Sequence, residues 1–283
     1  MNKIKSLFIG MWPMLAMGFA GYSIYQLVNN GMSYIWLGTL LTTLPIMLFI
    51  GRVMMLKDIS RTTAHFPLLT ILAVIGIVLS IYGFTKLEPQ NIIGIFVATI
   101  GFITFLLYNF WYSSFGTREH SNLKKGNILK EFSALASDGT KVLSTSFNGN
   151  PTIFIFFRGN WCPLCMAQIK EIANKYRDLS KYGAKVVLIA PQPEKNTKAL
   201  AKKFNVPFVF LTDVKNQAAR SLGIALPNGL PMGMEMLGYD KETVLPTTII
   251  TDATGKIIYS DMTENYRIRP EPSEFIKVLQ NNA

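Results

Sequence analysis

Four long apolar stretches occupy the first part of the chain. They cover Ser6–Val28, Tyr34–Met55, Phe66–Phe84 and Ile92–Tyr112. Each is close to the ~20 residues that a helix needs to cross the hydrocarbon core of a bilayer. Charged residues are nearly absent from them, and aromatic residues lie near their ends, where amphipathic rings favour the headgroup region. The pattern predicts four membrane-spanning helices.

Two alternatives compete with this interpretation. Four buried helices of a soluble bundle would carry polar faces, which these stretches almost entirely lack. The first stretch also resembles a signal peptide, because Lys3 and Lys5 precede an apolar run that contains small residues. Since three further apolar stretches follow, we favour a retained signal-anchor. Cleavage of that segment would not change the side of the membrane on which the C-terminus lies.

Basic residues in the connections predict the orientation of the spans. They precede the first stretch and recur after the second and the fourth, as Arg52, Lys57, Arg61, Arg118, Lys124, Lys125 and Lys130. The first loop carries no charge, and the third carries only Lys86 with Glu88. The sequence therefore predicts an integral, multi-pass protein of the cytoplasmic membrane. The lipid bilayer is its partner, and both termini lie in the cytoplasm.

From about Asn127 the pattern changes to short apolar runs that alternate with amphipathic stretches. The predicted strands are Thr152–Phe157, Lys185–Ala190, Phe208–Leu211, Thr247–Thr251 and Lys256–Ser260, and the predicted helices are Pro163–Ser180, Glu194–Phe204, Asn216–Leu222 and Ser273–Gln280. Such an alternation, ending in a hairpin and a helix, predicts an α/β fold around a mixed central sheet flanked by helices. Leu226–Leu245, rich in Gly and Pro, is expected to be a long loop.

These patterns divide the chain into three parts. We expect a four-span transmembrane domain over residues 1–115, a juxtamembrane linker over 116–128 and the α/β domain over 129–283. Composition agrees with a membrane protein, because the mean hydropathy of the 283 residues is +0.28. The net charge of +11 does not indicate nucleic-acid binding, since no basic cluster interleaves with aromatic residues and no nucleic-acid motif is present.

The two cysteines of the chain, Cys162 and Cys165, lie within the stretch FFRGNWCPLC. A buried strand ends near Arg158, and a helix begins at Cys162 with Pro163 in its first turn. Free backbone N–H groups and the helix dipole stabilise an anion at that position. They lower the pKa of a thiol, and the thiolate is the nucleophile. We therefore expect an exposed, attacking Cys162 and a resolving Cys165, which together form a reversible redox centre.

Three other interpretations of the cysteine pair are weaker. A closed zinc site needs four ligands, and the two histidines, His65 and His120, lie in or beside the membrane part. Inert packing is an unusual role for a cysteine pair at a strand-to-helix turn. A permanent disulfide would close too small a ring to add much stability. The sequence therefore predicts a redox pair with no metal and no cofactor.

The C-terminal half resembles thioredoxin-fold proteins of the peroxiredoxin-like AhpC/TSA (alkyl hydroperoxide reductase/thiol-specific antioxidant) family. The resemblance covers roughly Leu129 to Leu279. It rests on the Arg-Gly-x-Trp-Cys-Pro-x-Cys motif at 158–165, on Leu245-Pro246-Thr247, and on the tail at 265–272. It implies that Pro246 is a cis-proline that packs against the cysteine pair and presents backbone to a substrate. An ordinary turn proline is the alternative. The substrate-binding or supporting residues are then Trp161, Pro163, Pro246 and Arg158.

The chain also departs from the family pattern. Classical peroxiredoxins place Thr or Ser three residues before the peroxidatic cysteine, where this chain has Gly159 or Cys162. They also have an arginine just before the strand that begins here at Thr247, where Pro246 stands. Thioredoxin buries an aspartate at the position of Phe156. Arg158 either lowers the thiol pKa by its charge or extends its charged end to solvent.

Two enzyme functions follow, together with one function from another class. The first is a membrane-anchored thiol–disulfide oxidoreductase acting on protein disulfides. The second is a thiol-dependent hydroperoxide reductase, in which Cys165 or Cys162 forms a sulfenic acid that its neighbour resolves. Both need a thioredoxin-like or other thiol reductant. The third is a membrane transporter or electron conduit with a redox-sensing domain, but the spans lack the cysteines and ionisable residues that such a path needs. The missing Thr and Arg favour the first function.

Overall fold

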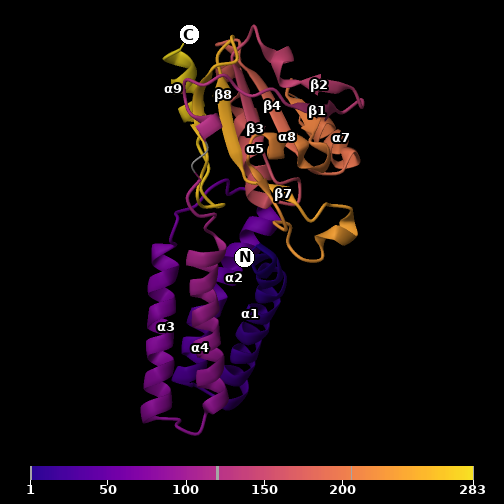
Figure 1. Ribbon diagram of the computed structural model, residues 1–283. Helices are drawn as coiled ribbons and strands as arrows, with labels where there is room; N and C mark the ends of the chain where they lie inside the picture. Colours follow the sequence, from indigo (N-terminus) through magenta and orange to yellow (C-terminus); the bar gives the residue numbers. More distant parts are fainter. Residues whose placement is uncertain (1, 119–120, 205, 283) are drawn as a thin grey trace. The chain divides into compact units, whose positions relative to one another are not determined.

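The computed structural model describes residues 2–118, 121–204 and 206–282, and its chain forms two compact units. One unit comprises Leu7–Leu56 and Thr62–Ser114. The other comprises Met1–Ser6, Lys57–Arg61 and Phe115–Ala283, and we call it the redox unit. Figure 1 shows the helices of the first unit in indigo to magenta and the mixed α/β layers of the redox unit in magenta to yellow.

The first unit is helical, as the apolar pattern predicts. Its helices are α1 (Asn2–Asn30, which begins in the redox unit), α2 (Tyr34–Leu56), α3 (Pro67–Lys86) and α4 (Ile92–Leu106), and α4 continues as the π-helix η1 (Leu107–Tyr112). All four are long and apolar enough to cross a membrane. Small and hydroxyl side chains contribute to their inner contacts, together with large apolar side chains such as Ile35 and Phe105. The Ser80 hydroxyl, for example, donates to the carbonyl of Ile35 at 3.1 Å, which satisfies a polar group between α3 and α2.

Glycines set how closely these helices approach. A Cβ added to Gly38 of α2 would lie 2.3 Å from the carbonyl oxygen of Gly76 in α3. Gly94 and Gly101 of α4 are packed against α2 in the same way. Gly18 and Gly21 of α1 have no other atom within 4 Å of the corresponding position. Those two glycines are therefore not packing positions.

The redox unit is built on a seven-stranded mixed sheet with the order β2-β1-β5-β4-β3-β8-β9. Its strands are β1 (Ser133–Ala136), β2 (Lys141–Leu143), β3 (Thr152–Phe156), β4 (Lys185–Ala190), β5 (Val209–Thr212), β8 (Thr247–Thr251) and β9 (Ile257–Asp261). A two-stranded sheet pairs β6 (Ala225–Leu226) with β7 (Thr243–Val244). β3, β4 and β5 are parallel, whereas β8 runs antiparallel to β3. The predicted mixed sheet is confirmed.

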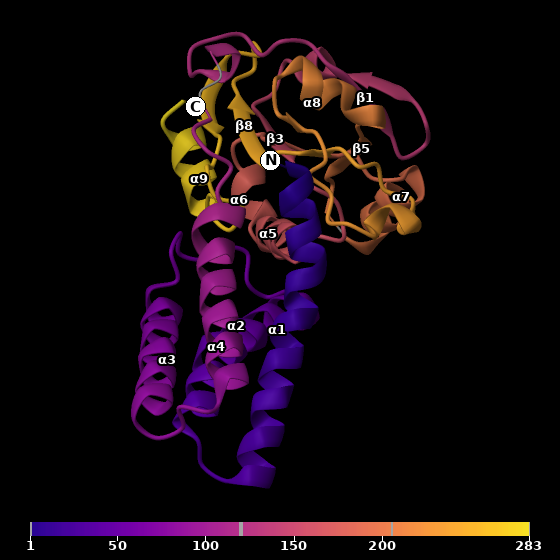
Figure 2. The same cartoon turned by 60° about the horizontal axis from the view of Figure 1, so that its bottom comes forward.

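Helices cover this sheet. They are α5 (Pro163–Asn174), α6 (Tyr176–Ser180), α7 (Glu194–Lys203), α8 (Gln217–Ser221) and α9 (Pro272–Gln280), with short 3₁₀ turns η2 (Ser121–Leu123), η3 (Ser144–Phe147), η4 (Val214–Asn216) and η5 (Met234–Leu237). α6 packs against α9, beside α5 in Figure 2. The single helix predicted over Pro163–Ser180 is interrupted at Lys175, whose ψ of 7° departs from the helical value.

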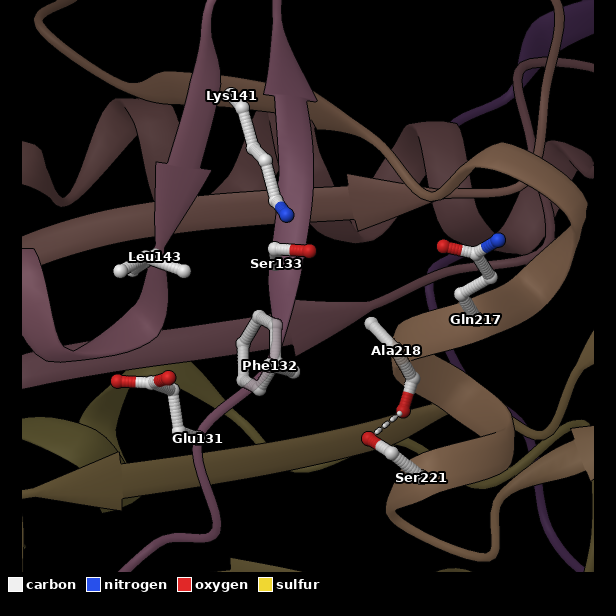
Figure 3. Close-up of a pocket in the computed structure, with 8 residues that line it drawn as sticks. All are labelled: Glu131, Phe132, Ser133, Lys141, Leu143, Gln217, Ala218 and Ser221. Carbon is white, nitrogen blue, oxygen red and sulfur yellow. Dashed lines mark hydrogen bonds between the residues drawn. The ribbon is translucent and has the colours of Figure 1, made fainter.

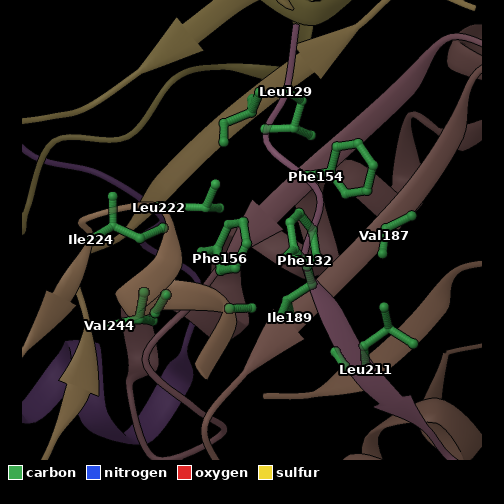
Figure 4. Packing of buried hydrophobic residues seen from close by; sticks show 14 of the residues in the cluster. Leu129, Phe132, Phe154, Phe156, Val187, Ile189, Leu211, Leu222, Ile224 and Val244 are labelled. Atoms are coloured by element: carbon green, nitrogen blue, oxygen red, sulfur yellow. The ribbon is translucent and has the colours of Figure 1, made fainter. Parts of the chain in front are cut away.

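The core uses both faces of the central strands, since side chains alternate along a strand. Phe154 and Phe156 of β3 pack with Val187 of β4 and with Leu222, which follows α8, in one apolar cluster (Figure 4). Ile153 and Ile155 point to the opposite face and are also buried. β3 is thus buried on both sides, which explains its uninterrupted apolar sequence and fixes the strand end that carries the cysteine pair.

Candidate active site

The cysteine pair lies where β3 gives way to α5. Gly159 allows the tight turn there, because its φ of +133° is open mainly to glycine, and an added Cβ would lie 2.9 Å from the Trp161 ring. Cys162 is the N-cap of α5, and its carbonyl accepts from the N–H of Met166 at 3.1 Å. Pro163 occupies the first helical position, where its missing N–H costs no hydrogen bond. This local geometry matches the sequence prediction.

The two sulfur atoms lie 2.9 Å apart and share a hydrogen bond. Both side chains are buried, with 3% of Cys162 and 1% of Cys165 exposed. The expected exposure of Cys162 is therefore wrong, whereas the assignment of the attacking role to either cysteine stays a prediction. The strand end and the packed first turn of α5 enclose both thiols.

Electrostatics separate the two thiols. Burial alone would raise the pKa of Cys165, yet that pKa is lowered to about 6 by the hydrogen bond from Cys162 and by the charge of Arg269, followed by Arg158. The pKa of Cys162 is raised well above its usual range, first by its hydrogen bond with Cys165 and then by burial. The pair therefore holds one thiolate, and Cys165 is its preferred site.

Arg158 is buried beside the pair and does not extend to solvent, with 6% of it exposed. Its Nη2 donates to the carbonyl of Gly229 at 2.6 Å, and its guanidinium carbon lies 4.7 Å from the centre of the Trp161 ring. The stacked ring and the hydrogen bond fix the guanidinium. Its charge lowers the pKa of both thiols. Of the two roles that the sequence leaves open for Arg158, the structure favours the electrostatic one.

Arg269 is a site residue that the sequence analysis did not identify. It is 4% exposed, and its Nη1 donates to the carbonyl of Ile268 at 2.7 Å. Its buried Nε and Nη2 atoms have no hydrogen-bond partner, yet its charge lowers the pKa of both thiols. The available signal was the Arg-Ile-Arg-Pro stretch before the last helix, where two charges precede an apolar helix.

A half-buried carboxylate, Asp261, interacts electrostatically with two arginines, Arg269 and Arg118. The pKa of Asp261 is raised by burial, while Arg269 and then Arg118 oppose that rise. Arg118 donates from Nη1 to the carbonyl of Pro246 and from Nη2 to the hydroxyl of Thr247, at 3.0 and 2.8 Å. Arg118 is thereby bonded to the start of β8.

Pro246 is buried directly before β8, but the described residues contain no cis peptide bond. The expectation of a cis-proline at position 246 is therefore wrong. β8 pairs with β3 through Thr247 and Phe156, the last residue of β3. The sheet thus brings the Pro246 backbone near the strand end that carries the cysteine turn, but its carbonyl is engaged by Arg118.

The loop between β6 and β7 is bonded to the cysteine turn. The Tyr239 hydroxyl donates to the Asn160 side-chain oxygen and accepts from the Asn196 side chain at 3.0 Å. The backbone N–H of Asn160 donates to Gln192 at 2.8 Å. Asn160, next to Trp161, is therefore fixed from two sides. The sequence analysis assigned none of these three partners, because their contacts depend on tertiary structure.

A separate pocket of about 280 Å³ lies at the β1–β2 edge of the sheet (Figure 3). It is lined by Glu131, Phe132, Ser133, Lys141, Leu143, Gln217, Ala218 and Ser221. Neither cysteine lines it. Within the described part of the chain, no three His, Cys, Asp or Glu side chains gather in a group that would hold a metal ion. The cysteine pair is thus the reactive site that the described residues offer.

Comparison with known proteins agrees with this site. The AhpC/TSA family profile matches residues 126–260. Residues 126–260 are therefore similar to proteins of the AhpC/TSA family, which agrees with the resemblance found in the sequence. Chloroplastic peroxiredoxin Q from Gentiana triflora is 30% identical over 104 residues, 37% of this chain and 48% of that protein. The protein of the same name from Triticum aestivum is 27% identical over 163 residues, 56% of this chain and 68% of that protein.

A second kind of relative is named for a different activity. The thiol-disulfide oxidoreductase ResA of Geobacillus thermodenitrificans is 22% identical over 147 residues, 52% of this chain and 73% of that protein. Peroxiredoxins and a thiol-disulfide oxidoreductase together support an oxidoreductase enzyme with a peroxiredoxin-like thioredoxin fold. None of the three matches extends over the whole chain, and the first spans about half of its relative.

Proposed function

We propose that this protein is a membrane-anchored, thiol-dependent hydroperoxide reductase, with Cys165 as the attacking thiolate and Cys162 as the resolving thiol. The observation that carries the proposal is the buried cysteine pair, whose sulfurs lie 2.9 Å apart under the charges of Arg269 and Arg158, which lower the pKa of Cys165 to about 6. At neutral pH most of Cys165 is then thiolate, which is the form that attacks a peroxide. This assignment reverses the order of attack that we expected from the sequence.

The reaction balances with two thiols and one external reductant. The Cys165 thiolate attacks one oxygen of the hydroperoxide, the O–O bond breaks, and the alcohol leaves with a proton. Cys165 becomes a sulfenic acid. The Cys162 thiol then attacks that sulfur, and water leaves as the disulfide forms. A thioredoxin-like dithiol, oxidised in turn, returns both cysteines to thiols.

Classical peroxiredoxins have an arginine just before the strand that corresponds to β8, and this chain does not. Arg269 supplies N–H donors in place of that arginine. As the O–O bond breaks, negative charge develops on the departing oxygen, and buried donors stabilise such charge strongly. The Nε and Nη2 of Arg269 are N–H donors that have no hydrogen-bond partner among the described residues. The absence of an arginine just before β8 therefore argues less against a peroxidase than the sequence alone suggests.

Thiol–disulfide exchange with proteins is the second candidate. The Trp-Cys-Pro-Leu-Cys motif at a helix N-terminus and the similarity to ResA favour it. The burial of both sulfurs favours the peroxidase, because a protein disulfide must reach the attacking sulfur in line, whereas a hydroperoxide group is small.

The four apolar helices support the anchoring part of the proposal, as each is long enough to cross a bilayer. The basic connections favour a cytoplasmic redox unit, and in that compartment dithiol reductants keep thiols reduced. The division at residues 115 and 128 remains a prediction.

Peroxide consumption tests the proposal. The reduced full-length chain in detergent is mixed with hydrogen peroxide or an organic hydroperoxide, and thiol loss is followed in time. We expect rapid loss in the wild type and in Cys162→Ser, and loss only at the rate of an ordinary thiol in Cys165→Ser. Slow loss in the wild type, with rapid reduction of a protein disulfide, would instead favour the second candidate.

A further inference from the structure

The loop that joins β6 to β7 carries Met236, the most exposed large apolar side chain among the described residues of its unit. Met236 is 91% exposed, Leu237 60% and Met232 49%. They lie on or next to the short turn η5, between Gly233 and Gly238, which both have positive φ. Large apolar side chains gathered at a loop tip mark a surface that contacts another apolar phase or a partner. We call residues 230–238 the apolar loop.

Hydrogen bonds join this loop to the first residues of α1. The Ser6 hydroxyl donates to the carbonyl of Leu230, and the Ser6 carbonyl accepts from the N–H of Met232 at 3.3 Å. The Asn2 side chain donates to the carbonyl of Pro227 at 2.9 Å. Residues up to Ser6 belong to the redox unit. Along the chain, Ser6 is directly followed by the apolar part of α1 at Leu7.

These contacts indicate that the apolar loop faces a lipid surface. If α1 enters the bilayer after Ser6, then backbone bonded to Ser6 lies at the depth of the headgroups. Interfacial segments bury apolar side chains about 5–10 Å into that boundary. Lys3 and Lys5 directly precede the apolar part of α1 and complement anionic headgroups. After the apolar loop, Lys241 stands between Asp240 and Glu242, and Glu242 is paired with Arg220. Glu235 is bonded back to the N–H of Gly233 at 2.9 Å.

We propose that the apolar loop inserts its tip, Met232, Met236 and Leu237, into the lipid headgroup layer. The redox centre then receives hydroperoxides carried by membrane lipids. This inference rests on the proposed hydroperoxide reductase and on its membrane anchoring. The loop is connected to the cysteine turn on both sides of its tip, through Arg158 to Gly229 and through Asn160 to Tyr239. A lipid hydroperoxide is reduced to the lipid alcohol and water while the two cysteines form a disulfide.

Photocrosslinking tests the surface without depending on activity. Met236 is replaced by the photoreactive p-benzoylphenylalanine in the full-length chain, which is reconstituted in vesicles of phosphatidylcholine and phosphatidylglycerol. The control carries the same group at Leu143, 41% exposed on β2. We expect lipid adducts at position 236 and none at 143. Adducts only to protein, or none at 236, would overturn the inference.

The substrate class has a separate test. In Met236→Asp/Leu237→Asp, both changes are on exposed side chains, so the fold tolerates them. We expect the rate with phospholipid hydroperoxide in vesicles to fall by about tenfold or more, because the effective concentration at the surface is lost. The rate with hydrogen peroxide should be unchanged. If the variant reduces phospholipid hydroperoxide as fast as the wild type does, the inference is overturned. If the wild type is inactive toward hydrogen peroxide, the proposed function itself is refuted.

Discussion

At the scale of single residues, the chemistry depends on which sulfur carries the negative charge. The sequence indicates a redox pair, because Cys-Pro-Leu-Cys follows a buried strand. It does not indicate which thiol ionises, since that depends on Arg269, which is distant in the chain and close in the fold. A lone charge beside a buried thiol lowers its pKa by one to a few units. The residue-level account therefore predicts a specific pH dependence.

Replacing Arg269 should move that pH dependence upward. In Arg269→Gln the positive charge is lost, so the pKa of Cys165 rises from about 6, by roughly one unit. The thiolate fraction, and with it the alkylation rate of Cys165, then falls at pH 6–7 and recovers at higher pH. Iodoacetamide labelling of the Cys165 peptide across pH, followed by mass spectrometry, measures the midpoint.

Two variants control for this effect. Arg269→Lys keeps the charge and should keep most of the shift, and Arg177→Gln, on exposed α6 surface, should leave the midpoint at its wild-type value. A midpoint that stays near pH 6 in Arg269→Gln would contradict the role assigned to this guanidinium.

Some features of the site residues were predicted from the sequence, and others were not. Cys162, Pro163 and Gly159 were placed correctly from the local motif, because a helix N-terminus is a local structure. The burial of both thiols was not predicted, since it depends on packing that involves distant segments. The trans peptide bond at Pro246 differs from the family resemblance, and Arg118 bonds to the carbonyl of that proline.

At the scale of elements, hydrophobic pattern predicted most of the structure. β4 and β8 have the predicted bounds, because Pro191 follows the first apolar run and Pro246 and Asp252 flank the second. β1 and β2 were not predicted, since they lie at or near the sheet edge and have mixed burial, which weakens the alternation. The break between α5 and α6 left no signal in the pattern, because the apolar positions continue across Lys175.

Among the helices of the first unit, Gly38 is the position least able to accept a side chain. In Gly38→Val, the new Cβ would overlap the Ser80 hydroxyl and the Gly76 carbonyl of α3. Forced overpacking costs about 1–3 kcal/mol, so the unfolding temperature of the full-length chain in detergent should fall. Gly51→Val, with no atom near its added Cβ, should have a much smaller effect. Equal unfolding temperatures for the two variants would contradict the packing between α2 and α3.

At the scale of the whole molecule, the chain combines a helical unit with a redox unit. Composition and pattern predicted both, because the apolar stretches and the α/β alternation are separate along the sequence. The membrane and the side on which each terminus lies are inferred from the apolar lengths and the basic connections. Within the redox unit, the contacts made by the residues before Leu7 and by Lys57–Arg61 were not predicted, because they join segments that are distant in sequence.

One such contact joins the α2–α3 connection to α5. Arg61 donates from Nη1 to one oxygen of Glu171 at 3.0 Å and from Nη2 to the other. Its Nε donates to the carbonyl of Arg269 at 3.0 Å. The redox unit thus includes a piece of the chain that the sequence assigned to the membrane domain.

Fusion reporters test the predicted arrangement across the membrane. With four spans and basic connections on the same side as the termini, alkaline phosphatase fused after Ala283 should be inactive. The same enzyme fused after Gly31, in the uncharged first loop, should be active. The reverse pattern of activities would place the redox unit outside the cytoplasm.

The most direct test of the central claim is to locate the sulfenic acid. Reduced full-length Cys162→Ser and Cys165→Ser are each mixed with hydrogen peroxide in the presence of dimedone, and the labelled cysteine is identified by mass spectrometry. The account predicts rapid labelling of Cys165 in Cys162→Ser and little labelling of Cys162 in Cys165→Ser. Rapid labelling of Cys162, with slow labelling of Cys165, would contradict it and return the attacking role to Cys162.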